Sequence, residues 1–186
     1  MASQVQIVNL SLVMISEETI TAMSEDIKAA RIATVVWDIA RRETLRAHPW
    51  NFAVSRADLA QLSTAPAFEY TYQYQLPTDC LRAINLYDTS SKWEVEGRKL
   101  LCDDGTVYLR YIADVTDTAQ FDALFSGALA RRLAAYLAFN LSNNRTLAAE
   151  MDKAFKEAVS LARLADAQES GDQASLSAET WIDSRS

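Results

Sequence analysis

The chain has 186 residues, of which 49% are hydrophobic and 23% charged, with only four glycines and three prolines. This composition is typical of a folded, helix-rich protein, and it excludes a long disordered tract and two domains of ordinary size. The net charge is −7, from 18 basic and 25 acidic residues, and the basic residues form no cluster. Tight sequence-specific DNA binding is therefore not expected. The acidic charge still permits the hypothesis that the protein forms a negative surface along which DNA slides without binding.

The sequence shows no pattern of a membrane span or a leader. The longest uncharged apolar run, over residues 133–141, is about half of the length that a bilayer-spanning helix needs. The first residues lack a basic start followed by an apolar block and a small-residue cleavage site. We therefore expect the protein to stay in the compartment in which it is made and to make no membrane contact.

The N-terminal part of the chain predicts a long helix. Residues 1–15 are apolar without a clean period, which suits a segment lying against another surface. Ser24 can cap a helix there, and the two acidic residues that follow it oppose the positive end of the helix dipole. Pro49 ends this helix just after His48. Apolar residues at three- and four-residue steps predict one buried stripe: Ile27, Ala30, Ile32, Val35, Ile39 and Leu45.

The middle of the chain changes to the period of strands. After a short helical stretch predicted over 56–62, four aromatic residues alternate with other residues and predict one ring-bearing strand face: Phe68, Tyr70, Tyr72 and Tyr74. Further strands are predicted over 80–87, 92–96, 98–102 and 106–112, with turns at 96–97 and 103–105. The middle is therefore expected to be a small antiparallel meander.

From Thr118 the helical period returns, and Ser142–Asn144 separates two helices. Small residues on the last helix let the two approach closely, which predicts an antiparallel helical hairpin. The predicted fold class is α+β, mainly α: a helical bundle with a small antiparallel β lobe inserted between the first long helix and this hairpin. One domain is expected over 1–168, with a helical body at 16–62 and 117–168, a β lobe at 66–115, and a flexible docking tail at 169–186.

Patterns of catalytic or metal-binding residues are weak. His48 is the only histidine, and its place before Pro49 favours a cap on the helix end over catalysis. Cys80 and Cys102 are too few for a disulfide framework or a zinc site, so we expect two reduced thiols buried in a sheet. We expect no enzyme activity, cofactor or metal. Four carboxylate pairs are better explained as helix starts, a strand face or a turn than as an acid–base pair: Glu17–Glu18, Glu25–Asp26, Glu94–Glu96 and Asp103–Asp104.

Aromatic residues give the clearest candidates for structural and docking roles. The ring-bearing strand could be a stacking platform for bases or sugars, but without interleaved basic residues a packed sheet face or subunit contact is favoured. Trp50 follows Pro49 and is expected to close the core between the helical body and the β lobe. Trp181 stands alone in a polar tail, so we expect it to anchor into a partner.

Several motifs together resemble the tail tubular protein A family of short-tailed bacteriophages, the head-to-tail adaptor or gatekeeper proteins. The resemblance rests mainly on the segment from Leu45 to Ala53, with His48, Pro49, Trp50 and Phe52, and on the segment from Tyr72 to Arg82, with Tyr74 and Pro77. Further matches run along nearly the whole chain: Ile20-Thr21, Met23, Arg56, Leu59-Ala60, Glu96-Gly97-Arg98, Leu100-Leu101, Leu109 to Ile112, Val115 to Asp117, Phe121-Asp122, Ala130 to Leu141, Ala162-Arg163, Asp166-Ala167, Trp181 and Arg185. A glycine common before the Ile-Thr motif is absent, and Ser16 or Glu17 stands near its place.

The resemblance implies a structural protein of the virion, made in the host cytoplasm. It implies a homo-oligomeric ring, generally of twelve copies, between the portal protein and the tail nozzle formed by a tail tubular protein B-like partner. Genomic DNA would pass through the centre without sequence-specific binding. Trp181 and Arg185 are the expected partner-docking residues. Two alternatives are a tail-associated enzyme that degrades peptidoglycan and a helical binding module of a prophage without a role in the virion.

Overall fold

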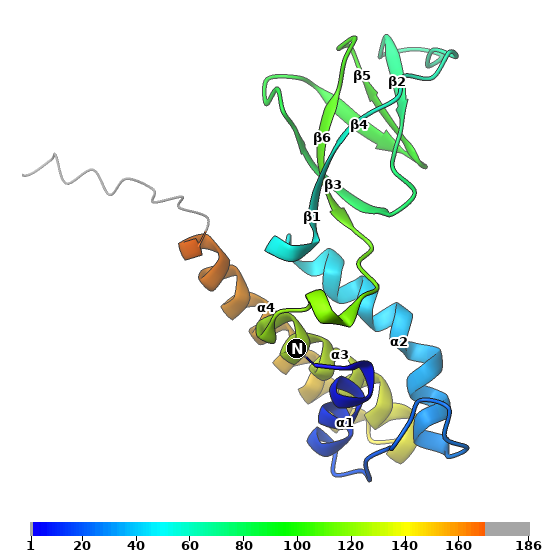
Figure 1. Ribbon diagram of the computed structural model, residues 1–186, viewed down its shortest axis with the longest axis vertical. Coiled ribbons are helices and arrows are strands. Elements are labelled where there is room, and N and C mark those ends of the chain that lie inside the picture. Colours follow the sequence, from blue (N-terminus) through cyan, green and yellow to red (C-terminus); the bar gives the residue numbers. More distant parts are fainter. Residues whose placement is uncertain (1, 170–186) are drawn as a thin grey trace, which may run out of the picture.

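The computed structural model describes residues 2–169, which form a helical body at one end of the molecule and a β lobe at the other (Figure 1). The chain is 48% helical, and the prediction of an α+β fold, mainly α, is confirmed. The helices are α1 (Gln4–Met14), α2 (Lys28–Ala47), α3 (Ala123–Ser142) and α4 (Arg145–Glu169), with short 3-10 helices at Asn51–Ala53 and Thr118–Gln120. The strands are β1 (Val54–Asp58), β2 (Tyr72–Gln75), β3 (Cys80–Leu86), β4 (Trp93–Glu96), β5 (Lys99–Cys102) and β6 (Tyr108–Ala113).

Helix α3 is the centre of the helical body, because α1, α2 and α4 all pack against it. The small side chains on its inner face let neighbouring helices approach closely. The alanines and leucines of α3 that are fully buried are Ala128, Leu129, Ala130, Leu133, Ala134, Leu137 and Ala138. Asn143 adopts a left-handed conformation that ends α3, and the side chain of Asn144 accepts a 3.0 Å hydrogen bond from the backbone of Leu147 at the start of α4. The predicted break and the predicted helical hairpin are therefore confirmed.

The apolar N-terminal segment forms α1, and the surface against which it lies is α3 of the same chain. Ser3 caps α1 in a reciprocal arrangement with Gln6. Ile7 and Leu12 are buried in the core of the helical body, whereas Val13 is exposed. The helix was missed at the level of sequence because apolar residues occur around most of its circumference, so no amphipathic period is visible.

The first long helix, α2, begins at Lys28, and the predicted cap at Ser24 is wrong. Ile27 occupies the capping position and makes no capping hydrogen bond through its side chain. The Glu25 carboxylate instead accepts hydrogen bonds from the backbone and hydroxyl of Thr21, and these hold the pKa of Glu25 below its usual value. Those contacts keep the acidic residues in the preceding loop and outside the first helical turn.

The β lobe contains two antiparallel sheets, with strand orders β1-β6-β3 and β2-β5-β4, instead of the predicted meander. The predicted short helix over 56–62 is also wrong, because β1 pairs with β6 from Val54↔Ile112 to Asp58↔Tyr108. The local sequence Arg-Ala-Asp-Leu-Ala suits a helix, but its pairing partner lies far away along the chain. The lobe thus begins earlier than the predicted boundary at residue 66.

The ring-bearing strand is shorter than predicted, and the prediction of four rings on one face is wrong. Strand β2 begins only at Tyr72, and Glu69 adopts a positive φ of 73°, which interrupts the extended backbone. Phe68 is 79% exposed, in the loop before the strand. Tyr74 is buried, and its hydroxyl donates a 2.6 Å hydrogen bond to the backbone of Asp104.

The two sheets of the lobe share one hydrophobic core. Tyr74, Leu100 and Cys102 enter it from the β2-β5-β4 sheet, and Leu109 and Tyr111 enter it from β6. Because side chains alternate between the faces of a strand, each sheet turns its other face away from this core. Cys80 and Cys102 are free and buried, as predicted, and burial raises the pKa of both thiols.

Trp50 closes the helical core beside the lobe. It is fully buried, and its indole nitrogen donates a 2.8 Å hydrogen bond to the backbone of Thr44. Its ring makes edge-to-face contacts, each with 5.1 Å between ring centroids, with His48 and Phe125. The predicted burial of Trp50 is confirmed, and the contacts that bury it lie within the helical body and not between the body and the lobe.

A buried arginine joins the helical body to the lobe. The guanidinium of Arg41, on α2, is 1% exposed and pairs with Asp114 just after β6. It also donates a 2.7 Å hydrogen bond to the backbone of Val115 and lies 3.3 Å from the carboxylate of Asp38. These contacts connect the segment that leaves the lobe to helix α2.

Candidate interaction face on the β lobe

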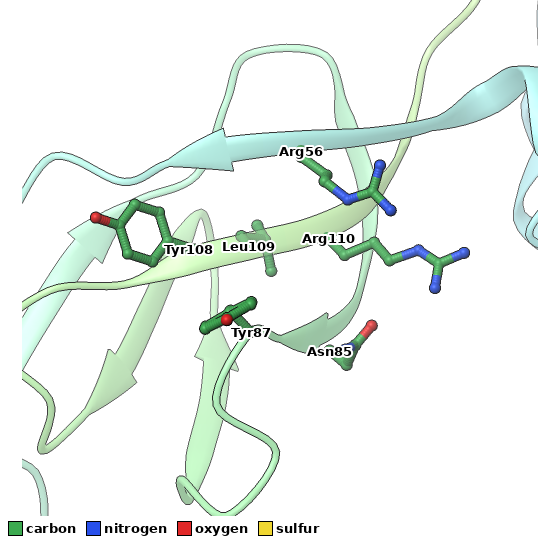
Figure 2. A pocket seen from close by; sticks show the side chains of 6 residues that line it. All are labelled: Arg56, Asn85, Tyr87, Tyr108, Leu109 and Arg110. Atoms are coloured by element: carbon green, nitrogen blue, oxygen red, sulfur yellow. The ribbon is translucent and has the colours of Figure 1, made fainter.

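The outer face of the β1-β6-β3 sheet carries two arginines directly opposite each other. Arg56 on β1 is the register partner of Arg110 on β6, and both side chains are exposed. Figure 2 shows their guanidinium groups extending in the same direction from the two strands. Within residues 2–165, neither guanidinium forms an ion pair or a hydrogen bond. Like charges directly opposite each other destabilise a sheet, so this pair favours an acidic partner.

Two tyrosines extend the same face. Tyr87, just after β3, is 85% exposed, and Tyr108 on β6 is 52% exposed. Their rings meet edge to face, with 6.3 Å between centroids, and the backbone of Tyr87 donates a 2.9 Å hydrogen bond to that of Tyr108. We call Arg56, Tyr87, Tyr108 and Arg110 the Arg/Tyr face.

A shallow hollow of about 220 Å³ lies within the Arg/Tyr face (Figure 2). Asn85 supplies an amide at its edge, next to Arg110 in the strand register. Leu109 also lines the hollow, although its side chain enters the core on the other side of the sheet. Hydrogen-bond donors and aromatic rings thus surround a shallow, open hollow, which is the arrangement of an interaction surface and not of an enclosed catalytic pocket.

A second group of arginines lies where the lobe meets the helical body. Arg46, Arg82 and Arg98 line a hollow of about 550 Å³ beside Trp93. Arg46 and Arg98 donate hydrogen bonds to the backbone carbonyls of Leu81 and Pro77 respectively. Burial, together with the charges of Arg46 and Arg163, lowers the pKa of Arg82. The backbone contacts show that two of these arginines stabilise the lobe itself.

Most of the residues that were singled out in the sequence have structural positions. His48 ends α2 and is buried against Trp50, while Phe52 packs against Phe121 and Phe125. Tyr72, Tyr74 and Pro77 lie in the lobe, where the carbonyl of Pro77 accepts hydrogen bonds from Cys80 and Arg98. The fold thus separates the two predicted motifs, since His48 to Phe52 belong to the helical core and Tyr72 to Pro77 to the lobe. Trp181 and Arg185 lie outside the described residues.

The carboxylate pairs lie in loops, in a turn and on the edge strand β4, and none is buried. Among the side chains that the structure describes, up to residue 165, no group of three histidine, cysteine or acidic residues could hold a metal ion. In the same range, no helix is long and apolar enough to cross a membrane.

The Arg/Tyr face was not predicted from the sequence. Part of the face could have been found from the predicted strand over 106–112, because alternation places Tyr108 and Arg110 on one face of that strand. Nothing in the sequence indicated that Arg56 belongs to this face, since Arg56 lay in a predicted helix. Only the pairing of β1 with β6 brings it opposite Arg110. A comparison with models of known protein families finds no match, and neither does a comparison with curated protein sequences.

Proposed function

We propose that this chain is a structural adaptor of a short-tailed bacteriophage, positioned in a ring between the portal protein and the tail nozzle. The observation that carries the proposal is the two-part architecture in which a helical body holds a β lobe with an exposed interaction face. The Arg41–Asp114 pair connects these parts. This architecture agrees with what the motifs around Trp50 and Tyr74 imply, namely a helical bundle with a β-rich lobe.

Exposed apolar side chains on the helical body support contacts with neighbouring subunits. Val35 and Ile39 lie four residues apart on α2 and are both exposed, so the prediction that they belong to the buried stripe is wrong. Leu161 and Leu164 lie three residues apart on α4 and are also exposed. Residues three or four apart share one helix face, so each pair offers an apolar strip to an adjacent helix. Helices packed side by side around a channel can use such strips.

The charge of the chain agrees with passage of DNA through the centre of a ring. A net charge of −7 weakens nonspecific adhesion of a polyanion. In this proposal the protein forms the wall of a channel and retains or releases DNA without reading its sequence.

The C-terminal residues Trp181 and Arg185 dock on the portal or on an adjacent subunit, with the ring of Trp181 filling a pocket and the guanidinium of Arg185 meeting an acceptor.

Cryo-electron microscopy of the neck of intact phage particles tests the proposal. We expect density for this chain in a ring between the portal and the nozzle, with the copy number given by the symmetry. Absence of the chain from purified particles, measured by mass spectrometry, would contradict the proposal.

Truncation after Gln168 tests the docking residues, because it should abolish attachment to portal-bearing capsids while leaving helical circular dichroism unchanged. A double charge-reversal variant on α4, Arg145→Glu with Lys153→Glu, is the control that should still attach.

A further inference from the structure

The Arg/Tyr face has the composition of a protein-binding surface. Arginine and tyrosine are enriched among the residues that dominate binding energy at protein interfaces. Arg56 and Arg110 lie opposite each other and form no ion pair within residues 2–165. Asp58 lies on the same face opposite Tyr108 and offsets only part of their charge, so a carboxylate-bearing partner relieves their repulsion. Two guanidiniums are a small footprint for duplex DNA, whose binding rests on many phosphate contacts. The balance of charges therefore favours protein carboxylates over a nucleic acid.

The other sheet of the lobe carries acidic side chains on its outer face. On β4, Trp93 and Val95 share the face of their register partners Cys102 and Leu100, which enter the core. Glu94 and Glu96 consequently lie on the opposite face of the same strand, and both are exposed. Strand β4 is also the edge of its sheet, so this face is accessible from the side.

Further carboxylates extend this acidic surface. Burial raises the pKa of Tyr70, and the neighbouring charges of Glu94, Glu69 and Asp103 raise it further. These groups gather at one side of the sheet, where Asp103 also accepts hydrogen bonds from Thr71. Lys99 is the basic side chain on this face and contacts Gln73. We call Glu69, Glu94, Glu96 and Asp103 the acidic face.

The two faces point away from a shared core, one from each sheet. The Arg/Tyr face lies outside β1-β6-β3, and the acidic face lies outside β2-β5-β4. Opposite charges on opposite sides of one body suit a head-to-tail contact, in which one face of each copy meets the other face of the next. An isologous contact would instead place two Arg/Tyr faces together and increase the repulsion between arginines.

We propose that the Arg/Tyr face of one copy binds the acidic face of a second copy of this chain. The guanidiniums of Arg56 and Arg110 pair with the carboxylates of Glu94 and Glu96, and Tyr87 and Tyr108 cover the contact from water. This contact rests on the proposed function for its biological role, because it supplies the lobe-to-lobe interface of the ring. Self-association itself is a property of the purified chain and is measured without a phage particle.

A reciprocal charge swap tests the contact. One variant carries Arg56→Glu and Arg110→Glu, and the other carries Glu94→Lys and Glu96→Lys. Sedimentation equilibrium at low salt, from micromolar to about millimolar protein, measures the association constant of each variant and of their equimolar mixture. We expect the wild type to associate, each variant alone to associate at least about tenfold more weakly, and the mixture to regain association. Raising the salt concentration should weaken the wild-type contact.

Control measurements separate this contact from loss of folding and from DNA binding. Circular dichroism and melting temperature establish that both variants fold. The α4 variant Arg145→Glu with Lys153→Glu changes the net charge by the same amount as the Arg56→Glu, Arg110→Glu variant, and it should associate like the wild type.

Three outcomes overturn the proposal: the wild type shows no association up to millimolar concentration, the folded charge-swap variants associate like the wild type, or the mixture stays dissociated. Binding of a fluorescent DNA duplex that depends on Arg56 and Arg110, with unchanged self-association, would assign the face to nucleic acid instead. Loss of the chain from phage particles would refute the proposed function and leave this result intact.

Discussion

The helical body and the β lobe use the same type of side chain in opposite ways. In the body, the guanidinium of Arg132 lies 2.6 Å from the carboxylate of Glu43 and 2.7 Å from that of Asp152. The hydroxyl of Tyr136 also meets Glu43, at 2.9 Å. In the lobe, Arg110 lies opposite another arginine and forms no ion pair among the described residues. Arg132 therefore stabilises the body, whereas Arg110 remains available to a partner.

The aromatic residues show the same division. Trp50 and Phe125 are fully buried in the body, where they contact each other, whereas Tyr87 and Tyr108 contact each other on the surface of the lobe. Burial of large rings provides a substantial part of folding energy, and exposed rings provide binding energy when a partner covers them. The comparison indicates that the body supplies stability and that the lobe supplies much of the recognition surface.

Replacing Trp50 with alanine should have the largest effect on stability. Loss of a buried tryptophan costs about 3–5 kcal/mol, because it removes the contacts with Phe125 and leaves a cavity. Chemical denaturation followed by circular dichroism measures the free energy of unfolding. Tyr87→Ala is the matched lobe variant and should change that energy by less than about 0.5 kcal/mol. Equal losses for the two variants would contradict the division between body and lobe.

Replacing Asp114 with alanine should cost about 3 kcal/mol. The change leaves the buried charge of Arg41 with only the backbone of Val115 and the largely exposed carboxylate of Asp38. Because the pair joins the two regions, we also expect the unfolding transition to broaden or divide in calorimetry. Asp38→Ala is the control, since that side chain is 70% exposed and should contribute less than about 1 kcal/mol. A single sharp transition with unchanged midpoint would show that the pair does not couple body and lobe.

Two capping variants should differ by about 1 kcal/mol. Asp122 caps α3, and its carboxylate accepts a 2.6 Å hydrogen bond from the backbone of Phe125. Asp122→Ala should therefore reduce the free energy of unfolding by about 1 kcal/mol. Ser24→Ala should leave it nearly unchanged, because Ser24 does not cap α2. The same denaturation experiment measures both, and the opposite ranking would favour a helix that begins at Ser24.

The smallest effect concerns the rate at which the lobe thiols react. Cys80 and Cys102 are buried and their pKa values are raised, so less thiolate is present at neutral pH than in the unfolded chain. A chromogenic disulfide reagent should react slowly with the native protein and rapidly in urea. The native rate should rise at higher pH than the unfolded rate, since the folded pKa values lie above the ordinary thiol value. Rapid reaction of both thiols at neutral pH would show that the lobe core opens readily.

Local signals in the sequence predicted much of the helical body. The break at Ser142–Asn144 was visible because asparagine tolerates the left-handed conformation that Asn143 adopts. The end of α2 was visible because Pro49 disfavours a helical conformation in the residue before it. The burial of Trp50 followed from its place directly after that end. Each of these features depends on residues that are close together along the chain.

The lobe and its candidate site were decided by contacts between distant segments. Strand β1 forms because β6 supplies hydrogen-bond partners for residues whose local sequence suits a helix. The register of that pairing places Arg56 opposite Arg110, and a shift of one residue would turn Arg56 toward the core. Sequence alone thus determined the helical hairpin, the end of α2 and the buried thiols. Only the tertiary structure decided the two-sheet topology and the charged faces, because strand pairing depends on partners that no local pattern specifies.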